Sequence, residues 1–215
     1  MRGWRKFINF MHNKDLKRRI IEISYELALS HLGSCLTALD IIADIYKMKH
    51  KDEPFILSAG HAHLAHACVM EKYGIIKDAR ENIVRYGIHC ERSGGCDAST
   101  GSLGQGLPIA VGMALADRKK NVYCLISDGE CSEGSIFEAF RIMEENKLDN
   151  LKVYLNWNGW GAYREIIANP LPEEFDYLYE EVITTIMDFP FLKGQDAHYR
   201  IMSDEDYKSA MEILR

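Results

Sequence analysis

The sequence lacks any apolar run that approaches the ~20 residues of a membrane-spanning helix. Its first residues also lead into no apolar segment like that of a signal peptide. A basic stripe is missing as well, because 26 Lys and Arg residues stand against 32 Asp and Glu residues, which gives a formal net charge of −6. We therefore expect a cytoplasmic protein with no membrane or nucleic-acid partner, folded as one domain over residues 1–215.

Cysteine-based frameworks are also not indicated, because no two of the six cysteines form a Cys-x-x-Cys pair. Several of them lie inside apolar periodic runs, where a reduced thiol packs as a small hydrophobic group. We therefore predict buried, reduced thiols rather than a disulfide or zinc framework. The six residues are Cys35, Cys68, Cys90, Cys96, Cys124 and Cys131.

The sequence does contain apolar patterns typical of helices and of strands, and the two kinds alternate along the chain. Apolar residues at helical spacing alternate with short apolar runs that end in polar or glycine-rich turns, which is typical of strand–turn–helix units. The pattern predicts an α/β fold of three layers, with a mostly parallel sheet and helices on both faces. The expected helices span residues 15–30, 36–46, 61–72, 132–146, 173–181 and 203–214, and the expected strands span 54–57, 122–126, 151–155 and 182–186.

The sharpest chemical signal joins the ends of two neighbouring strands. Asp128 and Gly129 follow one predicted strand, and Asn158 follows the next, thirty positions after Asp128. Carboxylate and amide oxygens are ligands that suit Mg²⁺, and a diphosphate bound to a protein needs such a cation. Asp-Gly at 128–129 and Asn-Gly at 158–159 are each, taken alone, more often an ordinary turn. Only the two together therefore indicate a metal site.

Several motifs in the correct order resemble the transketolase family, most strongly over residues 15–161. The segment from Asp128 to Gly134 resembles the family's Gly-Asp-Gly region, although Ser127 replaces its first glycine. Residues 99–106 resemble the family's cofactor loop, and their Gly-x-x-Gly-x-Gly spacing differs from a dinucleotide fingerprint. Shorter matches surround His31, His61 and His89.

The resemblance implies a domain that binds the diphosphate of thiamine diphosphate through Mg²⁺ or Ca²⁺. It implies that Gly129 contacts the diphosphate, that Gly101 and Leu103 line the cofactor, and that Glu133 and Glu138 lie near a dimer interface and the aminopyrimidine. An acid such as Glu138 is equally expected on an ordinary surface helix. The implied cofactor-binding residues are Gly101, Leu103, Asp128, Gly129, Glu130, Glu138 and Asn158, and the implied metal ligands are Asp128, Asn158 and the main-chain carbonyl of Trp160.

The histidines divide into two groups. The resemblance places four of them around the reactive carbon and the substrate hydroxyls, where imidazole can exchange protons near neutral pH. The implied catalytic residues are His31, His61, His89, His198 and Glu133. The remaining histidines match no family motif, and we expect ordinary surface or partly buried roles for them; they are His12, His50, His63 and His66.

The family's pyrimidine-binding and C-terminal domains have no counterpart in this sequence. The resemblance therefore implies a subunit of a split transketolase, which transfers a two-carbon ketol unit from a ketose to an aldose with a separate partner subunit, as a homodimer or a heterotetramer. Its substrate would be a sugar or a sugar phosphate. Two alternatives remain open: another thiamine-dependent carboligase, and a reduced module that binds cofactor or partner without turnover.

Overall fold

A computed structural model describes residues 5–8, 12–161, 163–166, 181–185 and 189–215. Within these ranges, the helices are either too short or too polar to cross a membrane. The predicted acidic helix at 173–181 lies outside the described residues, except for its last position.

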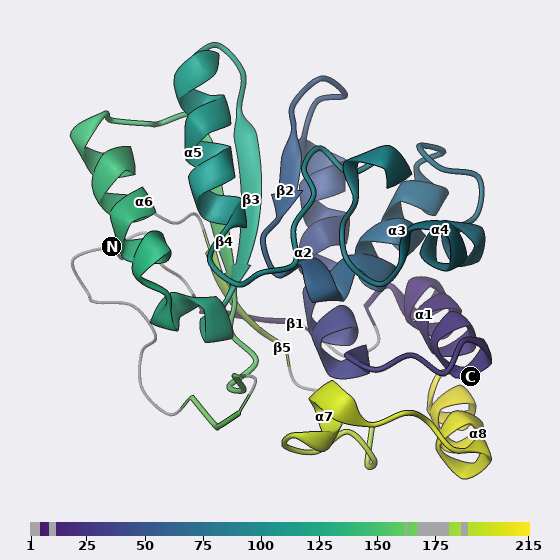
Figure 1. The fold of residues 1–215 in the computed structure, drawn as a ribbon. Coiled ribbons are helices and arrows are strands. Elements are labelled where there is room, and N and C mark those ends of the chain that lie inside the picture. The colour runs from purple at the N-terminus through teal and green to yellow at the C-terminus, as the bar shows by residue number, and fades with distance from the viewer. Residues whose placement is uncertain (1–4, 9–11, 162, 167–180, 186–188) are drawn as a thin grey trace.

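The centre of the fold is a parallel sheet of five strands in the order β1-β5-β4-β3-β2 (Figure 1). This confirms the predicted α/β class and the four expected strands, and it adds an N-terminal strand that the apolar pattern did not indicate. Every strand pair is parallel, so the carboxyl ends of the strands lie at one edge of the sheet. The strands are β1 (Arg5–Ile8), β2 (Phe55–Leu57), β3 (Val122–Ser127), β4 (Leu151–Asn156) and β5 (Glu181–Thr185).

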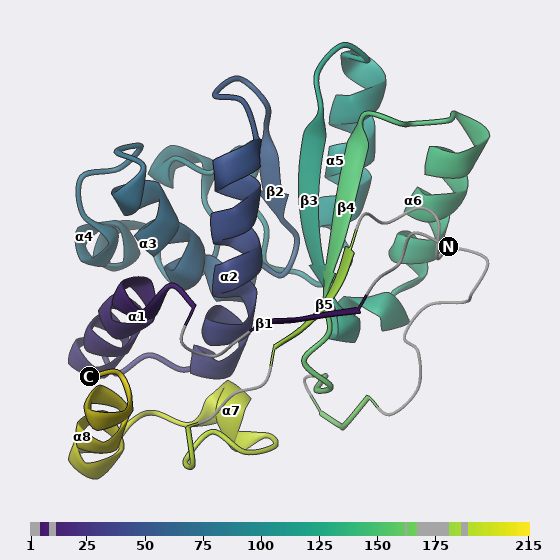
Figure 2. The same cartoon turned by 180° about the vertical axis from the view of Figure 1, so that it is seen from behind.

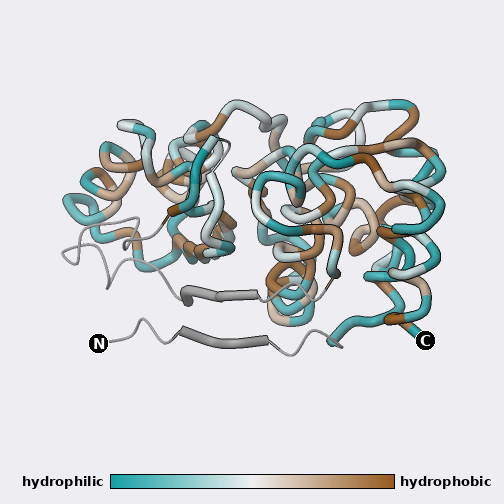
Figure 3. The backbone as a smooth tube through the Cα atoms, turned by 90° about the horizontal axis from the view of Figure 1, so that it is seen from below, coloured by the Kyte–Doolittle hydropathy of each residue, from teal (hydrophilic) through white to brown (hydrophobic). Residues whose placement is uncertain are grey.

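Helices cover both faces of the sheet (Figures 1 and 2). Two of them, α5 (Gly106–Ala116) and α6 (Gly134–Glu145), pack on one face. The other helices lie on the opposite side (Figures 1 and 2), and a view of the backbone from below shows hydrophobic and hydrophilic residues alternating along the helical coils (Figure 3). These other helices are α1 (Lys14–Glu26), α2 (Leu32–Met48), α3 (His63–Lys72), α4 (Ala79–Tyr86), α7 (Asp196–Tyr199) and α8 (Asp204–Ile213).

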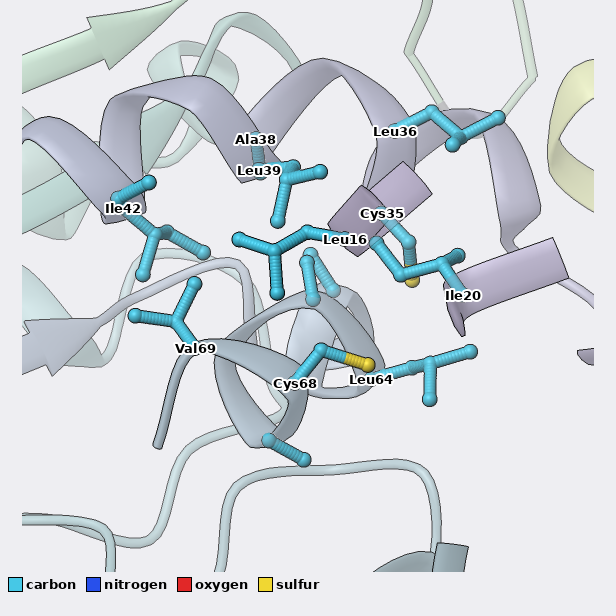
Figure 4. Packing of buried hydrophobic residues seen from close by; sticks show 14 of the residues in the cluster. Leu16, Ile20, Cys35, Leu36, Ala38, Leu39, Ile42, Leu64, Cys68 and Val69 are labelled. Carbon is cyan, nitrogen blue, oxygen red and sulfur yellow. The ribbon is translucent and has the colours of Figure 1, made fainter. Parts of the chain in front are cut away.

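The hydrophobic core consists of two clusters, one on each face of the sheet, because successive side chains of a strand point to opposite faces. Along β3, Tyr123 and Leu125 face the cluster of α1, α2 and α3, whereas Cys124 and Ile126 face the cluster of α5 and α6. Figure 4 shows the first cluster, in which Leu39 of α2 packs among side chains of α1 and α3. The sheet is therefore buried on both faces, which explains the continuous apolar runs of its central strands.

The boundaries of the first two helices differ from the prediction. The expected helix at 15–30 ends at Glu26, and α2 begins at Leu32, four residues before the expected start. Ala28 (φ 51°) and His31 (φ 64°) lie in the left-handed region, which interrupts a right-handed helix. The helix predicted from residue 61 begins with a 3₁₀ turn, η1 (Gly60–Ala62), ahead of α3.

The last helix begins as predicted. Ser203 caps α8, and its side chain accepts a hydrogen bond from the backbone N–H of Asp206 at 3.2 Å. The Asp206 carboxylate in turn accepts from the backbone N–H of Ser203 at 3.0 Å. This reciprocal capping box satisfies two donors that the first turn would otherwise leave unpaired.

Candidate functional site: a cavity at the carboxyl ends of the strands

A cavity of about 180 Å³ lies where β3 and β4 end. Its walls combine the ends of these strands with the N-terminus of α2, the glycine loop ahead of α5 and the helix α7, which Figure 1 shows near the carboxyl edge. In open parallel sheets, ligands bind beyond the carboxyl ends of the strands. The position of the cavity therefore agrees with the position of the sequence motifs.

Asp128 and Asn158 follow adjacent strands, and the structure brings them to the same edge of the sheet. Ser127, the last residue of β3, pairs with Asn156, the last residue of β4. The Asp128 carboxylate accepts hydrogen bonds from the backbone N–H groups of Gly159 at 2.6 Å and of Gly129 at 3.0 Å. The two motifs are therefore in direct contact, as the pairing of the strands requires.

The electrostatic setting of these two side chains suits a cation. Burial raises the pKa of Asp128 to about 7, although hydrogen bonds from neighbouring backbone N–H groups oppose the shift. Asn158 is a lining residue of the cavity, and its side-chain amide oxygen accepts a hydrogen bond from the backbone N–H of Trp160 at 2.9 Å. A carboxylate and an amide oxygen at one strand edge are hard donors of the kind that Mg²⁺ binds. The donor set thus fits the implied metal.

Gly129 and Trp160 complete this side of the cavity. A Cβ atom placed on Gly129 would reach the Cα atom of Gly161 at 3.4 Å, an ordinary contact, so the glycine leaves its backbone accessible from the cavity without being sterically obligatory. The proposed ligation by the carbonyl of Trp160 stays a prediction, as does the role of Gly129 towards a diphosphate.

Glu130 lies beneath the cavity rather than in its lining. Its fully buried carboxylate accepts from the Ser58 hydroxyl at 2.5 Å, from the backbone N–H of Gly104 at 3.0 Å and from the backbone N–H of Ser127 at 3.0 Å. One carboxylate therefore ties the end of β3 to the loop after β2 and to the glycine loop. Its described partners are groups of this chain, so its expected contact with the cofactor stays a prediction.

The glycine loop approaches its neighbours closely. A Cβ atom on Gly106 would lie 2.5 Å from the Cα atom of Ser58, and one on Gly104, which has a φ of +79°, would lie 2.7 Å from Cβ of Glu133. Only glycine fits such positions. This packing holds Gly101 and Leu103 in the cavity lining, where the sequence places them.

Four histidines from distant parts of the chain meet in the cavity, and they are the four that the resemblance selected: His31, His61, His89 and His198. The ring centroids of His31 and His198 are 4.3 Å apart, those of His61 and His198 are 5.3 Å apart, and those of His31 and His61 are 5.4 Å apart. The left-handed conformation of His31 lets its backbone N–H donate to the carbonyl of His198 at 2.7 Å. α7 is thereby fixed against the start of α2.

The histidine cluster favours neutral imidazole. Burial, together with the smaller effect of the neighbouring histidines, lowers the pKa of His31 to about 4 and that of His61 to about 3. Burial also lowers the pKa of His198. At neutral pH these rings therefore carry a lone pair on one nitrogen and a proton on the other, so each can accept or donate a hydrogen bond.

None of the four acids that the resemblance selected is among the described lining residues of the cavity; they are Asp128, Glu130, Glu133 and Glu138. Glu133 occupies the N-cap position of α6, without a capping hydrogen bond from its side chain, and Glu138 lies within the helix; both residues are exposed. Their expected places near an interface and the aminopyrimidine stay predictions. The structure adds Ser34, Ser127 and Gly161 to the cavity lining, and these had no signal of their own beyond adjacency to the motifs.

The expectation for His63 and His66 is wrong. Both are buried, with 0% and 1% of their surfaces exposed, because α3 inserts between α2 and the loop that follows α4. The predicted burial of the six cysteines is confirmed, and all six are free thiols in the structure. However, Cys90 and Cys96 lie directly beside these two histidines, so the cysteines do not all pack as independent hydrophobic groups.

A family model and the curated relatives of this chain point to the same protein family. Residues 31–161 match the family described as transketolase, thiamine diphosphate binding domain. One subunit of the apulose-4-phosphate transketolase of Phocaeicola vulgatus is 31% identical over 168 residues, which cover 69% of this chain and 60% of the relative. The 6-deoxy-6-sulfo-D-fructose transketolase subunit SqwG of a Clostridium species is 32% identical and covers 70% of this chain and 63% of the relative.

Longer curated enzymes and solved structures that resemble this chain are also transketolases. Human transketolase is 33% identical over 173 residues, and the match covers 69% of this chain and 28% of the human protein. The solved structure of a transketolase variant from Pichia stipitis has a TM-score of 0.75 and 18% identity, and the match covers 96% of this chain and 41% of that chain. The transketolase of Campylobacter jejuni has a TM-score of 0.71 and 22% identity, and the match covers 96% of this chain and 43% of that chain. The chain thus spans less than two thirds of these relatives, and it belongs to the transketolase family, of which it contains the thiamine diphosphate binding domain.

Proposed function

We propose that this chain is the diphosphate-binding subunit of a split transketolase, which transfers a two-carbon ketol unit from a ketose to an aldose. The observation that carries the proposal is the convergence of four histidines with the Asp128 and Asn158 loops on one cavity edge. A module that had lost turnover would have no need to keep four imidazoles together there.

Asp128, Asn158 and the carbonyl of Trp160 would hold the Mg²⁺ that neutralises the diphosphate of thiamine diphosphate. Gly129, Gly101 and Leu103 would contact the cofactor from the cavity lining. When bound, the cofactor supplies the carbanion and electron sink that protein side chains lack. Asp128 keeps its orientation through its hydrogen bonds from Gly159 and Gly129, so the first ligand is positioned before the metal arrives.

The histidines would bind and orient the sugar. Neutral rings of His31, His61 and His198 can donate to a hydroxyl or carbonyl oxygen and accept from a hydroxyl group, and they can move a proton between them. Because the rings lie 4.3 to 5.4 Å apart between centroids, they address neighbouring oxygens of one small substrate. His89, which is exposed and lines the same cavity, would also contact the substrate.

A partner chain would complete the site. The cavity of about 180 Å³ is smaller than the roughly 300–1,000 Å³ typical of sites that enclose a small molecule. Two relatives are named as transketolase subunits, which supports a separate pyrimidine-binding subunit. The exposed acids Glu133 and Glu138 would face this partner, in a cytoplasmic homodimer or heterotetramer.

The proposed substrates are sugars or sugar phosphates. The names of the two relatives refer to sugars with a phosphate or a sulfo group, which supports an anionic sugar for this chain as well. Sulfo and phosphate groups both place negative charge at the end of the substrate away from the reacting carbon.

Calorimetric titration of thiamine diphosphate into the chain with its partner, in the presence and absence of Mg²⁺, tests the proposal. We expect Mg²⁺-dependent binding to the wild type and a loss of at least about 100-fold in affinity for Asp128→Ala. Asp149→Ala, an exposed aspartate after α6, is the matched control and should bind normally. Unchanged affinity in the Asp128 variant would contradict the ligand assignment.

A further inference from the structure

A second group of potential ligands lies outside the cavity. His63, His66, Cys90 and Cys96 place one ligand atom each within 4.8 Å of one another. All four are buried, with 0%, 1%, 2% and 5% of their surfaces exposed. None of the four belongs to the described lining of the cavity, so this group is separate from the proposed cofactor site.

The distances within the group match those between the ligands of one tetrahedral ion. Cys90 Sγ lies 3.5 Å from His63 Nδ1 and 3.8 Å from His66 Nδ1. Cys96 Sγ lies 3.7 Å from each of the same two nitrogens. Bond lengths of about 2.3 Å to sulfur and about 2.05 Å to nitrogen at a tetrahedral angle put those atoms about 3.6 Å apart. Four atoms at these spacings surround one point.

The second nitrogen of each imidazole is held by another side chain. His63 Nε2 lies 3.1 Å from Asn82 Oδ1, and the amide nitrogen of Asn82 donates to the carbonyl of Gly94 at 2.8 Å. The Asn82 oxygen can only accept, so His63 carries its proton on Nε2 and presents the lone pair of Nδ1 to the sulfurs. His66 Nε2 lies 2.7 Å from the hydroxyl of Tyr46. Metal-ligating histidines are oriented by outer contacts of this kind.

Two thiol-to-imidazole hydrogen bonds are the simplest metal-free explanation of the cluster. They would pair each sulfur with one ring, and each sulfur would then have one near and one distant nitrogen. Instead, Cys96 Sγ is equidistant from the two nitrogens, and the two distances of Cys90 Sγ differ by only a few tenths of an ångström. Equal distances fit a shared centre, and burial without a cation would leave weakly paired polar groups in an apolar core.

We propose that His63, His66, Cys90 and Cys96 bind a structural Zn²⁺ ion. Two sulfur and two nitrogen ligands in a closed, buried arrangement are typical of structural zinc, and two thiolates balance its charge. The ion leaves no position for a substrate, so its role is to hold the chain rather than to react.

The site joins two segments that reach the cavity. His61 precedes the first ligand by two residues on η1 and α3, and His89 is the residue directly before Cys90. The loop that carries the two cysteines is also held by the Thr100 hydroxyl, which donates to the carbonyl of Leu57 at 2.6 Å. Zinc thus fixes the backbone of two cavity histidines without touching the cavity.

Metal analysis of the purified chain, expressed without a polyhistidine tag, tests the proposal independently of enzymatic activity. We expect about one zinc ion per chain, retained through dialysis. Replacement of zinc by Co²⁺ should give the intense visible and thiolate charge-transfer absorption of tetrahedral cobalt. Cys96→Ser should show a weaker thiolate absorption, because only Cys90 still supplies a thiolate, and should bind zinc at least about 10-fold more weakly. Cys68→Ser, a buried thiol of the same α3 helix, is the control and should keep both properties.

Two results would overturn the assignment. One is a wild-type chain that stays without zinc or tetrahedral cobalt after refolding with a stoichiometric amount of either ion. The other is an intact mass lower by two hydrogens in protein purified without oxygen, which would show a Cys90–Cys96 disulfide. Because the cobalt spectrum is recorded on the wild type, the test holds even if Cys96→Ser does not fold.

Discussion

The two groups of histidines use the same side chain in opposite ways. His63 and His66 are closed in the core, and both nitrogens of each ring have a neighbouring partner. In the cavity, His61 and His198 contact other rings, but their nitrogens have no hydrogen-bond partner within the described part of the chain. A ring fixed at both nitrogens supports structure, whereas a ring with free nitrogens is available for substrate. The comparison predicts different consequences for the same substitution.

The largest expected effect separates chemistry from binding in the cavity. His61→Ala should reduce ketol transfer by about 10² to 10⁴-fold, the usual range for a lost proton-transfer group, and should leave cofactor affinity nearly unchanged. Steady-state rates with the reconstituted partner, beside calorimetric titration of the cofactor, measure both quantities. An unchanged rate would remove His61 from the mechanism.

The second effect contrasts the two groups by an identical change. His63→Ala should lower the free energy of unfolding by about 3 kcal/mol or more, because it empties a buried site and leaves its partners unpaired. His198→Ala, at a half-buried ring, should change it by less than about 1 kcal/mol. Urea denaturation of both variants at one zinc concentration provides the measurement. A similar loss of unfolding free energy in both variants would contradict the structural role assigned to His63 and not to His198.

A smaller effect concerns the hydroxyl that holds His66. Tyr46→Phe removes only the oxygen that contacts His66 Nε2, so the ring stays in place with a less restricted orientation. We expect zinc affinity to fall by about 10-fold, at the lower end of the range for outer contacts. Competition with a chromophoric chelator measures the affinity. Tyr86→Phe, on α4, serves as the control, and equal affinities for all three proteins would show that Tyr46 does not orient the ligand.

The smallest effect is on the pH dependence of stability. The pKa of His31 is about 4 in the folded chain, below the ordinary value of about 6.5. Between these pH values the unfolded chain binds a proton that the folded chain does not, so stability falls as pH falls through this window. His31→Asn, which tolerates the left-handed φ of 64°, should lose less stability over the same window. Urea midpoints near pH 7 and pH 5 compare the two proteins, and parallel losses would contradict the assignment.

Most of the cavity follows from the sequence because its residues belong to segments with their own signals. Asp128 and Asn158 end apolar strands, and parallel strands bring their carboxyl ends together whatever the remaining fold. The four cavity histidines came from the family resemblance, since nothing in their local spacing places residues 31 and 198 side by side. The start of α2 was missed because two non-glycine residues adopt left-handed conformations that local propensities disfavour.

The zinc ligands could not be assigned in this way. His63 and His66 are three positions apart, whereas Cys90 and Cys96 are separated by six, and neither spacing has the Cys-x-x-Cys form that indicates a site. Only the packing of α3 against the loop after α4 brings the two pairs together. The Cys-x-x-Cys pattern alone therefore misses a site that combines two histidines with two cysteines.

The proposed function depends above all on one metal ion that Asp128 and Asn158 share beside the histidine cavity. The most direct measurement is a crystal structure of the chain with its partner, thiamine diphosphate and Mn²⁺ in place of Mg²⁺, with anomalous scattering recorded at the manganese edge. We expect one peak within about 2.3 Å of a carboxylate oxygen of Asp128 and of the amide oxygen of Asn158. A bound cofactor whose manganese peak lies away from both oxygens would contradict it.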